Sequence, residues 1–304
     1  MSKNIESVVI CCFKRDVHLL RICIASVRYW HPTIPVYLLK DEGHGKFSTE
    51  EIEKHWNAKV LETEFKKGGW GLTKLMALFA EENSRILLLD SDTVFLGPVL
   101  DYLGQFEEDF VVTGVKSDDP SHYLIPRDYI AVDKVKEIFD KEYVYPGYGF
   151  NSGHIVMTRG LINKGDFHKL VDFTDSGFKA IAPVGLFPHA DQGIFNYIFA
   201  KKKQEGLCSV RYDDFWLWSG LEELSEISLE RLQQKKGYNK IIHWAGTKSH
   251  FISKMDRSDI LFFYEDIYYQ KLPFGSLRKK IHHFSRIFML SAKKALKILG
   301  LISK

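Results

Sequence analysis

The sequence lacks any apolar run of about 18 residues, the length that crosses a bilayer as a helix, so we expect no transmembrane helix. Its first residues also lack the basic start, long apolar stretch and cleavage site of a secretory signal peptide. Only four cysteines occur among 304 residues, and no two have Cys-x-x-Cys spacing. We therefore expect reduced core thiols of a cytosolic protein, without a zinc site or a disulfide framework.

Two further absences restrict the function. No Gly-x-Gly-x-x-Gly motif follows the first predicted strand, which argues against a dinucleotide-dependent enzyme. No acidic residue occurs after Asp266, whereas nine of the 42 lysines and arginines lie between Lys271 and Lys304. All 39 acidic residues therefore belong to the body of the chain, which is net acidic and does not suit a nucleic-acid-binding protein.

The hydrophobic content of 45% and the charged content of 27% indicate a globular protein with a sizeable core. Apolar runs predict strands at residues 7–13, 35–39, 59–64, 86–89, 110–115 and 241–244, and residues 149–157 are expected to form a turn that runs into a strand. Helical spacing of apolar residues predicts helices at 17–30, 48–57, 72–79, 132–139, 166–175 and 190–199. Gly68 and Gly69 are expected to break the chain before residue 72. The opening succession of strand, helix and strand implies a right-handed parallel unit, hence a Rossmann-like α/β fold.

Two carboxylates follow directly after the apolar run Ile86 to Leu89, which has the pattern of a strand buried on both faces of a parallel sheet. Asp90 and Asp92 are two residues apart, so in an extended chain their side chains point the same way. Ligands bind at the carboxyl ends of strands in open α/β sheets, and buried carboxylates need compensation. A divalent cation that holds a phosphate meets both conditions. The alternative is a helix cap or turn.

His243 follows the apolar pair Ile241 and Ile242 and precedes Gly246 and Lys248. A histidine in such a place is often an ordinary core residue. Together with two carboxylates, however, an imidazole forms a ligand set that suits Mn²⁺ better than Mg²⁺. Gly246 would let the backbone approach a phosphate, and Lys248 would neutralise its charge.

Two other short motifs have simple explanations when each is taken alone. Asp191 and Gln192 begin a predicted helix, where a carboxylate is stabilised by the helix dipole. Asn151, Ser152 and Gly153 are typical residues of a turn that leads into a strand.

Together the motifs form an ordered series: LTKL (72–75), DSDTVFL (90–96), FNSG (150–153), DQGIFN (191–196) and HWAG (243–246). Their order and spacing resemble glycosyltransferase family 8, the glycogenin-like retaining enzymes that include bacterial lipopolysaccharide glycosyltransferases. The resemblance extends from the first strand to about residue 250. It implies a GT-A fold over residues 1–270, with a mixed, mostly parallel sheet flanked by helices. It also implies transfer of a hexose, glucose or galactose, from a UDP-sugar to a saccharide or glycolipid acceptor.

The resemblance also implies roles for individual residues. The metal, Mn²⁺ or Mg²⁺, would be bound by Asp90, Asp92 and His243. The donor would be bound by Cys12, Phe13, Lys74, Asp90, Ser91, Ser152, Gly246 and Lys248. Asp191 and Gln192 match the pair beneath the anomeric carbon, and Asn151 and Ser152 match residues near the donor sugar. The catalytic residues would be Asp191, Gln192 and Asn151. Whether Asp191 or Gln192 is a nucleophile or only stabilises an oxocarbenium-like state is left open by the sequence.

One departure from the family pattern concerns the loop that closes over the diphosphate. The family usually has its lysine six residues after the histidine, followed by Pro-Trp, whereas Lys248 is five residues after His243 and is followed by Ser249 and His250. The loop is therefore shortened or rearranged. The aromatic residues Phe215, Trp216 and Trp218 either stack on the acceptor sugar or belong to the core.

Two other functions compete with this interpretation. A sugar nucleotidyltransferase is also an α/β, metal-dependent enzyme, but it would have a glycine- and arginine-rich loop after the first strand, and CCFKRDVHLL has none. A non-catalytic nucleotide-sugar-binding protein would not need the complete set of Asp90, Asp92 and His243.

The tail at residues 271–304 is a separate segment in this interpretation. Apolar residues recur along it at helical spacing, with basic residues between them: Leu277, Ile281, Phe284, Phe288, Ala295, Leu299 and Ile302. This pattern is typical of a helix in the interface of an anionic membrane. We therefore expect residues 277–304 to bind the inner face of the cell membrane. The alternative is a helix docked on the body, with its lysines turned towards the acidic domain.

Overall fold

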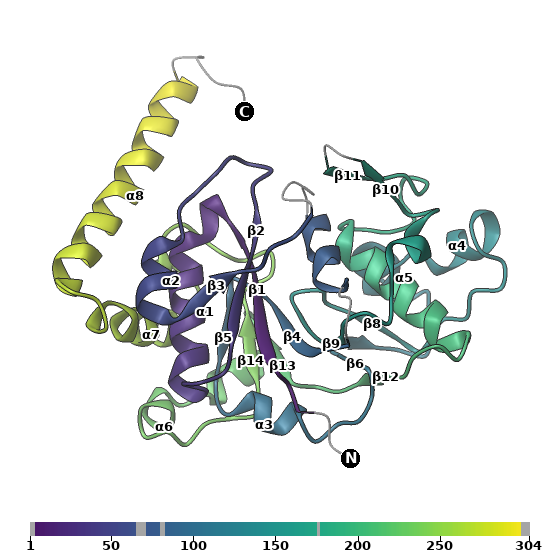
Figure 1. The fold of residues 1–304 in the computed structure, drawn as a ribbon, viewed down its shortest axis with the longest axis horizontal. Helices are drawn as coiled ribbons and strands as arrows, with labels where there is room; N and C mark the ends of the chain where they lie inside the picture. The colour runs from purple at the N-terminus through teal and green to yellow at the C-terminus, as the bar shows by residue number, and fades with distance from the viewer. Residues whose placement is uncertain (1–3, 65–70, 80–82, 175–176, 299–304) are drawn as a thin grey trace.

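The computed structural model describes residues 4–64, 71–79, 83–174 and 177–298. A seven-stranded sheet runs through the middle of the molecule (Figure 1), in the strand order β12-β6-β9-β4-β1-β2-β3. Six of these strands are parallel to one another, while β9 is antiparallel to both of its neighbours. The expected mixed, mostly parallel α/β architecture is confirmed.

The strands of this sheet are β1 (Ser7–Phe13), β2 (Val36–Asp41), β3 (Ala58–Val60), β4 (Arg85–Asp90), β6 (Phe110–Val112), β9 (His154–Thr158) and β12 (Val210–Tyr212). Smaller sheets pair β5 (Thr93–Phe95) and β13 (Trp216–Trp218) with β14 (Ile241–His243), β7 (Gly114–Lys116) with β8 (Tyr148–Phe150), and β10 (Val171–Thr174) with β11 (Gly177–Ala180). The α-helices are α1 (Val17–Trp30), α2 (Glu50–Trp56), α3 (Val99–Leu103), α4 (Val132–Ile138), α5 (Asp191–Gln204), α6 (Leu229–Gln233), α7 (Ser258–Gln270) and α8 (Gly275–Ile298).

Successive side chains of β1 enter two different cores, because a strand presents alternate residues to opposite faces of a sheet. Val8 and Ile10 pack in the core that also holds α1 and α7, whereas Val9 and Cys11 pack in the core that holds α5. Both faces of β1 and β4 are therefore covered by helices. This burial explains why these strands are continuous apolar runs rather than alternating ones.

Four predicted elements differ from the structure. The strand predicted at 59–64 is shorter, because β3 ends at Val60. Residues 72–79 form a 3₁₀ helix, Leu72–Ala77, instead of an α-helix. The strand predicted at 110–115 is divided at Thr113 into β6 and β7, which belong to different sheets. The helix predicted at 166–175 is wrong: one 3₁₀ turn, Lys164–Phe167, is followed by β10. The chain break predicted at Gly68 and Gly69, and the end of that helix at Asp175, lie outside the described residues.

The helix α8 extends away from the body of the protein (Figure 1). Its first turns contact the body through ion pairs: Arg278 lies 2.8 Å from Glu51, and Lys279 lies 2.9 Å from Glu265. The polar side of α8 therefore faces the body in these first turns. This is the arrangement expected if the helix is docked on the body with its basic residues turned towards the acidic domain. The body supplies the acidic partners that the tail itself lacks.

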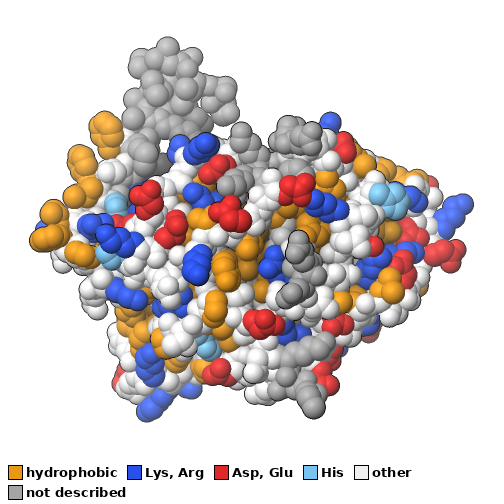
Figure 2. Space-filling view, viewed as in Figure 1, with side chains coloured by type: hydrophobic (Ala, Val, Ile, Leu, Met, Phe, Trp, Pro, Cys, Tyr) orange, Lys and Arg blue, Asp and Glu red, His pale blue; other side chains and the backbone are white. Residues whose placement is uncertain are grey.

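The apolar side of α8 is turned towards solvent. The exposed fractions are 57% for Leu277, 52% for Ile281, 72% for Phe284 and 63% for Phe288. Figure 2 shows hydrophobic side chains along the outer edge of this helix. The side chain of Ala295 is not described, and Leu299 and Ile302 lie outside the described residues. Among the helices of the described part of the chain, none is both long and apolar enough to cross a membrane.

Candidate active site

A small three-stranded sheet joins the two sequence motifs that carry metal-ligand chemistry. In the antiparallel pair of β5 and β14, His243 lies opposite Thr93, the residue next to Asp92. The Trp244 amide donates a hydrogen bond of 3.1 Å to the Asp92 carbonyl. This backbone pairing places His243 beside the end of β4, although more than 150 residues separate them in the sequence.

Asp90, Asp92 and His243 form a compact cluster. One ligand atom from each lies within 4.8 Å of the others. The His243 Nε2 atom is 3.4 Å from Asp92 Oδ1 and 3.8 Å from Asp90 Oδ2. Asp92 and His243 are buried, and within the described residues the Nδ1 atom of His243 has no hydrogen-bond partner. Two carboxylates and one imidazole that converge in this way fit a divalent cation.

Lys74 is buried between two acidic residues of the site. Its Nζ lies 2.9 Å from both carboxylate oxygens of Asp90 and 2.9 Å from Asp191 Oδ2. Burial alone would lower the pKa of Lys74, but the carboxylates of Asp191 and Asp90 raise it above its usual value, so the side chain is a cation. Burial, together with the neighbouring Asp92, raises the pKa of Asp90. Lys74 therefore links the candidate metal cluster to the candidate donor-sugar residues.

A second lysine approaches the cluster from the other side. The Nζ of Lys248 lies 2.6 Å from Asp16 Oδ2 and 3.5 Å from Asp92 Oδ2. Burial would raise the pKa of Asp92, but His243 and Lys248 together lower it below its usual value. The shortened loop thus still brings its lysine to the cluster. Asp16 was not predicted; its only sequence signal is a carboxylate just after the first strand.

The donor-sugar residues meet at the start of α5. The Ser152 hydroxyl donates to Asp191 Oδ2 at 2.8 Å, and the Ser152 amide donates to Gln192 Oε1 at 3.3 Å. The Gln192 amide group donates to the Asp128 carbonyl. Asn151 Oδ1 accepts a hydrogen bond of 2.7 Å from the Gly153 amide. The predicted Ser152, Asp191 and Gln192 are therefore joined by hydrogen bonds, and Asn151 precedes Ser152 in the same turn.

Two residues just before α5 have positive φ angles, His189 at φ 54° and Ala190 at φ 48°. Such conformations cost free energy in residues other than glycine and are concentrated at functional sites. Here they turn the chain so that Asp191 begins the helix beside Lys74.

Two glycines leave space for site residues. A Cβ atom at Gly153 would lie 2.2 Å from Cε1 of His243, and one at Gly71 would lie 2.5 Å from Oδ1 of Asp191. Neither neighbour could remain in place beside a larger side chain. Gly153 belongs to the predicted FNSG motif, whereas Gly71 was missed and precedes the LTKL motif directly.

The other predicted donor residues differ in accessibility. Cys12 is fully buried, and its thiol donates to the Leu39 carbonyl at 3.7 Å, so neither its side chain nor its backbone is exposed in this structure. Phe13 is partly buried at the end of β1, and Ser91 is buried between the two aspartates. Gly246 is exposed, has φ 73°, and has open space where a Cβ would be.

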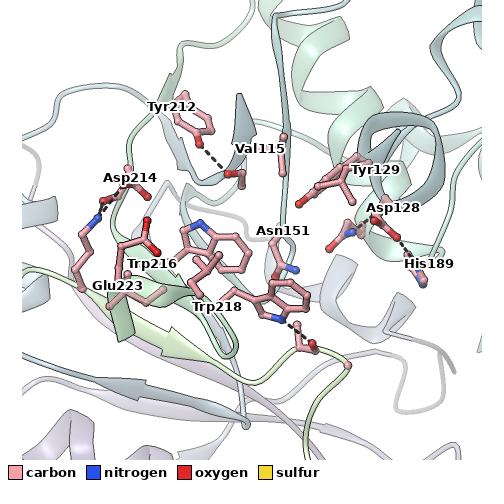
Figure 3. A pocket seen from close by; sticks show the side chains of 18 of the residues that line it. Val115, Asp128, Tyr129, Asn151, His189, Tyr212, Asp214, Trp216, Trp218 and Glu223 are labelled. Carbon is pink, nitrogen blue, oxygen red and sulfur yellow. Dashed lines mark hydrogen bonds and ion pairs between the residues drawn. The ribbon is translucent and has the colours of Figure 1, made fainter. Parts of the chain in front are cut away.

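The aromatic cluster divides into two parts. Phe215 is fully buried in the core, whereas Trp216 and Trp218 line a cavity of about 1040 Å³. Asn151 lies between these tryptophans and Tyr129 on the opposite wall (Figure 3). The cavity is at the upper end of the roughly 300–1,000 Å³ of usual ligand sites. It has room for a ligand next to the donor-sugar residues.

A likeness to solved structures supports the fold. The structure of WbbM, a bifunctional glycosyltransferase, matches with TM-score 0.53 and 14% identity over 88% of this chain and 50% of the WbbM chain. GlyE from Streptococcus pneumoniae (TM-score 0.47, 14% identity, 90% and 62% coverage) and the galactosyltransferase LgtC (0.46, 12%, 86% and 95%) also match. The chain spans half the length of the WbbM chain. At this identity the likeness shows the fold, which is that of the GT-A glycosyltransferases.

No protein-family model matches the sequence, and no curated protein matches it either. The resemblance to glycosyltransferase family 8 therefore stays a prediction based on the five motifs.

Proposed function

We propose that the protein is a retaining glycosyltransferase that moves a hexose, glucose or galactose, from a UDP-sugar to a glycan acceptor. The observation that carries this proposal is the convergence of Asp90, Asp92 and His243 at the end of β4, with Lys74 connecting them to Asp191. A metal cluster joined to a second carboxylate site suits a diphosphate on one side and a sugar on the other. The proposed acceptor is a bacterial cell-surface saccharide of the lipopolysaccharide or capsule type.

Mn²⁺ would be held by the two carboxylates of Asp90 and Asp92 and by the His243 imidazole. When bound, it supplies Lewis-acid stabilisation of the negative charge that builds up on the departing UDP. Lys248 adds fixed positive potential on the same side of the site, because its ammonium already lies beside Asp92. The exposed backbone of Gly246 leaves room for the diphosphate.

The donor sugar would lie over Asn151, Asp191 and Gln192. Gln192 is held by hydrogen bonds at both ends of its amide, so it suits the positioning of a sugar better than attack on it. Asp191 is buried, and its Oδ2 atom contacts both Ser152 and Lys74. These contacts favour electrostatic stabilisation of an oxocarbenium-like state over formation of a covalent bond.

The apolar side of α8 supports a second part of the proposal, association with the inner face of a cell membrane. Amphipathic helices bind such interfaces through their apolar side, and in α8 this side is left uncovered by the body. Residues 271–304 would then be a separate membrane-binding segment that keeps the enzyme near a lipid-linked acceptor.

The proposal is tested by UDP release from a panel of UDP-sugars in the presence of Mn²⁺, with Asp92→Asn measured alongside. We expect release with at least one donor and a large loss in the variant. No release with any donor would favour a non-catalytic nucleotide-sugar-binding protein. Pyrophosphate formation from a sugar 1-phosphate and UTP would be expected of a sugar nucleotidyltransferase instead.

A further inference from the structure

Trp216 and Trp218 form a fixed aromatic wall of the cavity next to the donor-sugar residues. They are two residues apart on β13 and both line the cavity, while Leu217 between them packs in the core and borders the cavity as well. Trp218 is 40% exposed, and its Nε1 donates to the Ala245 carbonyl at 2.8 Å, which fixes the plane of the ring. An exposed, oriented indole beside a polar site is a binding surface rather than a core residue.

The position of this wall relative to the metal cluster is set by backbone pairing. Trp218 lies opposite His243 in the parallel pair of β13 and β14. The ring of Trp216 is 5.0 Å from the buried His154 ring, which is in turn 5.2 Å from the His243 ring. A molecule that stacks on the two tryptophans is therefore held at a fixed distance from the candidate metal ligands.

The charges around the cavity are not balanced. Arg127 is paired with Asp128 at 2.7 Å, and Lys240 is paired with Asp214 at 3.0 Å. Two more carboxylates, Glu223 and Glu226, come from the 3₁₀ helix Glu222–Glu226, and neither forms an ion pair with another described residue. The cavity therefore carries a net negative charge on its outer side, where Figure 3 shows Glu223 next to Trp216.

We propose that this cavity binds the acceptor as a pyranose without negative charge, stacked on Trp216 and Trp218, and that Glu223 and Glu226 reject sugars with a phosphate or carboxylate. A pyranose offers an apolar face of C–H groups to an indole ring and keeps its hydroxyl groups for polar partners. An anionic sugar in the same place would be repelled by the two unpaired carboxylates. This inference rests on the proposed function, because it assigns the substrate class of the same site.

The first test measures binding by NMR titration of the full-length protein with UDP and the diamagnetic Mg²⁺ present. The probes are glucose, galactose, N-acetylglucosamine and lactose, against glucose 6-phosphate and glucuronic acid. We expect at least one neutral sugar to bind, and each anionic sugar to bind about tenfold more weakly than its neutral counterpart. Binding of none of the neutral sugars, or equal binding of glucose and glucose 6-phosphate, would overturn the inference.

Variants separate the two parts of the inference. Glu223→Gln with Glu226→Gln should reduce the discrimination against glucose 6-phosphate severalfold. The matched control is Glu222→Gln, which removes the same charge from the same helix outside the cavity lining and should leave the discrimination unchanged. Trp218→Ala should weaken binding of the neutral sugar by about tenfold, and Trp218→Phe should restore most of it. If Glu223→Gln with Glu226→Gln discriminates against glucose 6-phosphate as strongly as Glu222→Gln does, the proposal that these two carboxylates reject anionic sugars is contradicted.

UDP release in the absence of any acceptor distinguishes failure of this inference from failure of the proposed function. If the wild type releases UDP but Trp218→Ala leaves sugar binding unchanged, only the inference fails. If sugar binding depends on Trp218 but no UDP-sugar is turned over, the proposed function fails and the binding cavity stands.

Discussion

The replacement of Lys74 by methionine tests the electrostatic centre of the site. In the wild type, the Lys74 ammonium lies 2.9 Å from the carboxylates of Asp90 and Asp191 and has almost no contact with water. Methionine fills a similar volume without the charge, so the variant would leave both carboxylates without this cation. Removing one member of a buried ion pair typically costs about 3–5 kcal/mol, a large part of the stability of a typical domain.

The assay is urea unfolding followed by tryptophan fluorescence at pH 7. We expect Lys74→Met to lower the free energy of unfolding by about 3–5 kcal/mol. Adding Asp191→Asn to this variant removes one of the uncompensated charges and should recover about 1–2 kcal/mol. The control is Lys164→Met, which breaks the exposed pair with Glu64 and should cost less than about 1 kcal/mol.

Acidic pH provides a check on the same reasoning. Without Lys74, the pKa of the buried Asp90 in the folded protein rises further, because no cation then offsets its burial and the neighbouring Asp92, whereas in the unfolded chain this carboxylate is hydrated and keeps its usual pKa. Protonation then stabilises the folded variant relative to its unfolded chain. The difference between the variant and the wild type in the free energy of unfolding should therefore become smaller as the pH is lowered from 7 to 5. Two results would refute this description of the site. One is a free energy of unfolding of Lys74→Met within about 1 kcal/mol of the wild-type value at pH 7, and the other is a difference between the two proteins that does not change with pH.

Three further predictions use other parts of the structure. Gly153→Ala should displace His243 and weaken Mn²⁺ binding by roughly tenfold or more, whereas Gly206→Ala, with open space at its Cβ, should not; calorimetric titration compares the two. Burial, with nearby cationic groups, lowers the pKa of His18 from 6.5 to about 4. The unfolded chain then binds more protons, so stability falls by about 1–2 kcal/mol from pH 7 to pH 5, and His18→Gln should flatten this profile in thermal unfolding. Phe284→Asp should reduce co-sedimentation with anionic phosphatidylglycerol vesicles and leave UDP release intact; unchanged sedimentation would remove the apolar side of α8 as a membrane contact.

Local patterns in the sequence predict the elements that are buried on both sides. The strand predicted at 7–13 and the helix predicted at 17–30 have the bounds of β1 and α1, because continuous apolar runs and helical periodicity are strong signals there. The helix predicted at 166–175 was wrong because of the local sequence. Asn163 and Asp166 form a capping box, but the chain continues into Val171, Phe173 and Thr174, whose side chains favour a strand.

Most of the candidate site could be named from the sequence, but its geometry could not. The pairing of β14 with β5 connects residues far apart in the chain, and no local pattern specifies it. The ion pair of Asp16 with Lys248 joins residues that are 232 positions apart and appears only in the folded structure. The direction of α8 is also a tertiary property. Its periodicity predicted an apolar side, whereas the contacts of Arg278 and Lys279 with the body determine that this side faces outwards.

The most direct measurement of the central claim is the binding of Mn²⁺ in the presence of UDP, followed by the electron paramagnetic resonance signal of the free ion. We predict one bound ion per chain in the wild type and an affinity at least about tenfold weaker in Asp92→Asn and His243→Ala. Unfolding midpoints of both variants near that of wild type ensure that the loss belongs to the site. Equal Mn²⁺ affinity in the wild type and both variants would contradict the assignment of Asp92 and His243 as metal ligands.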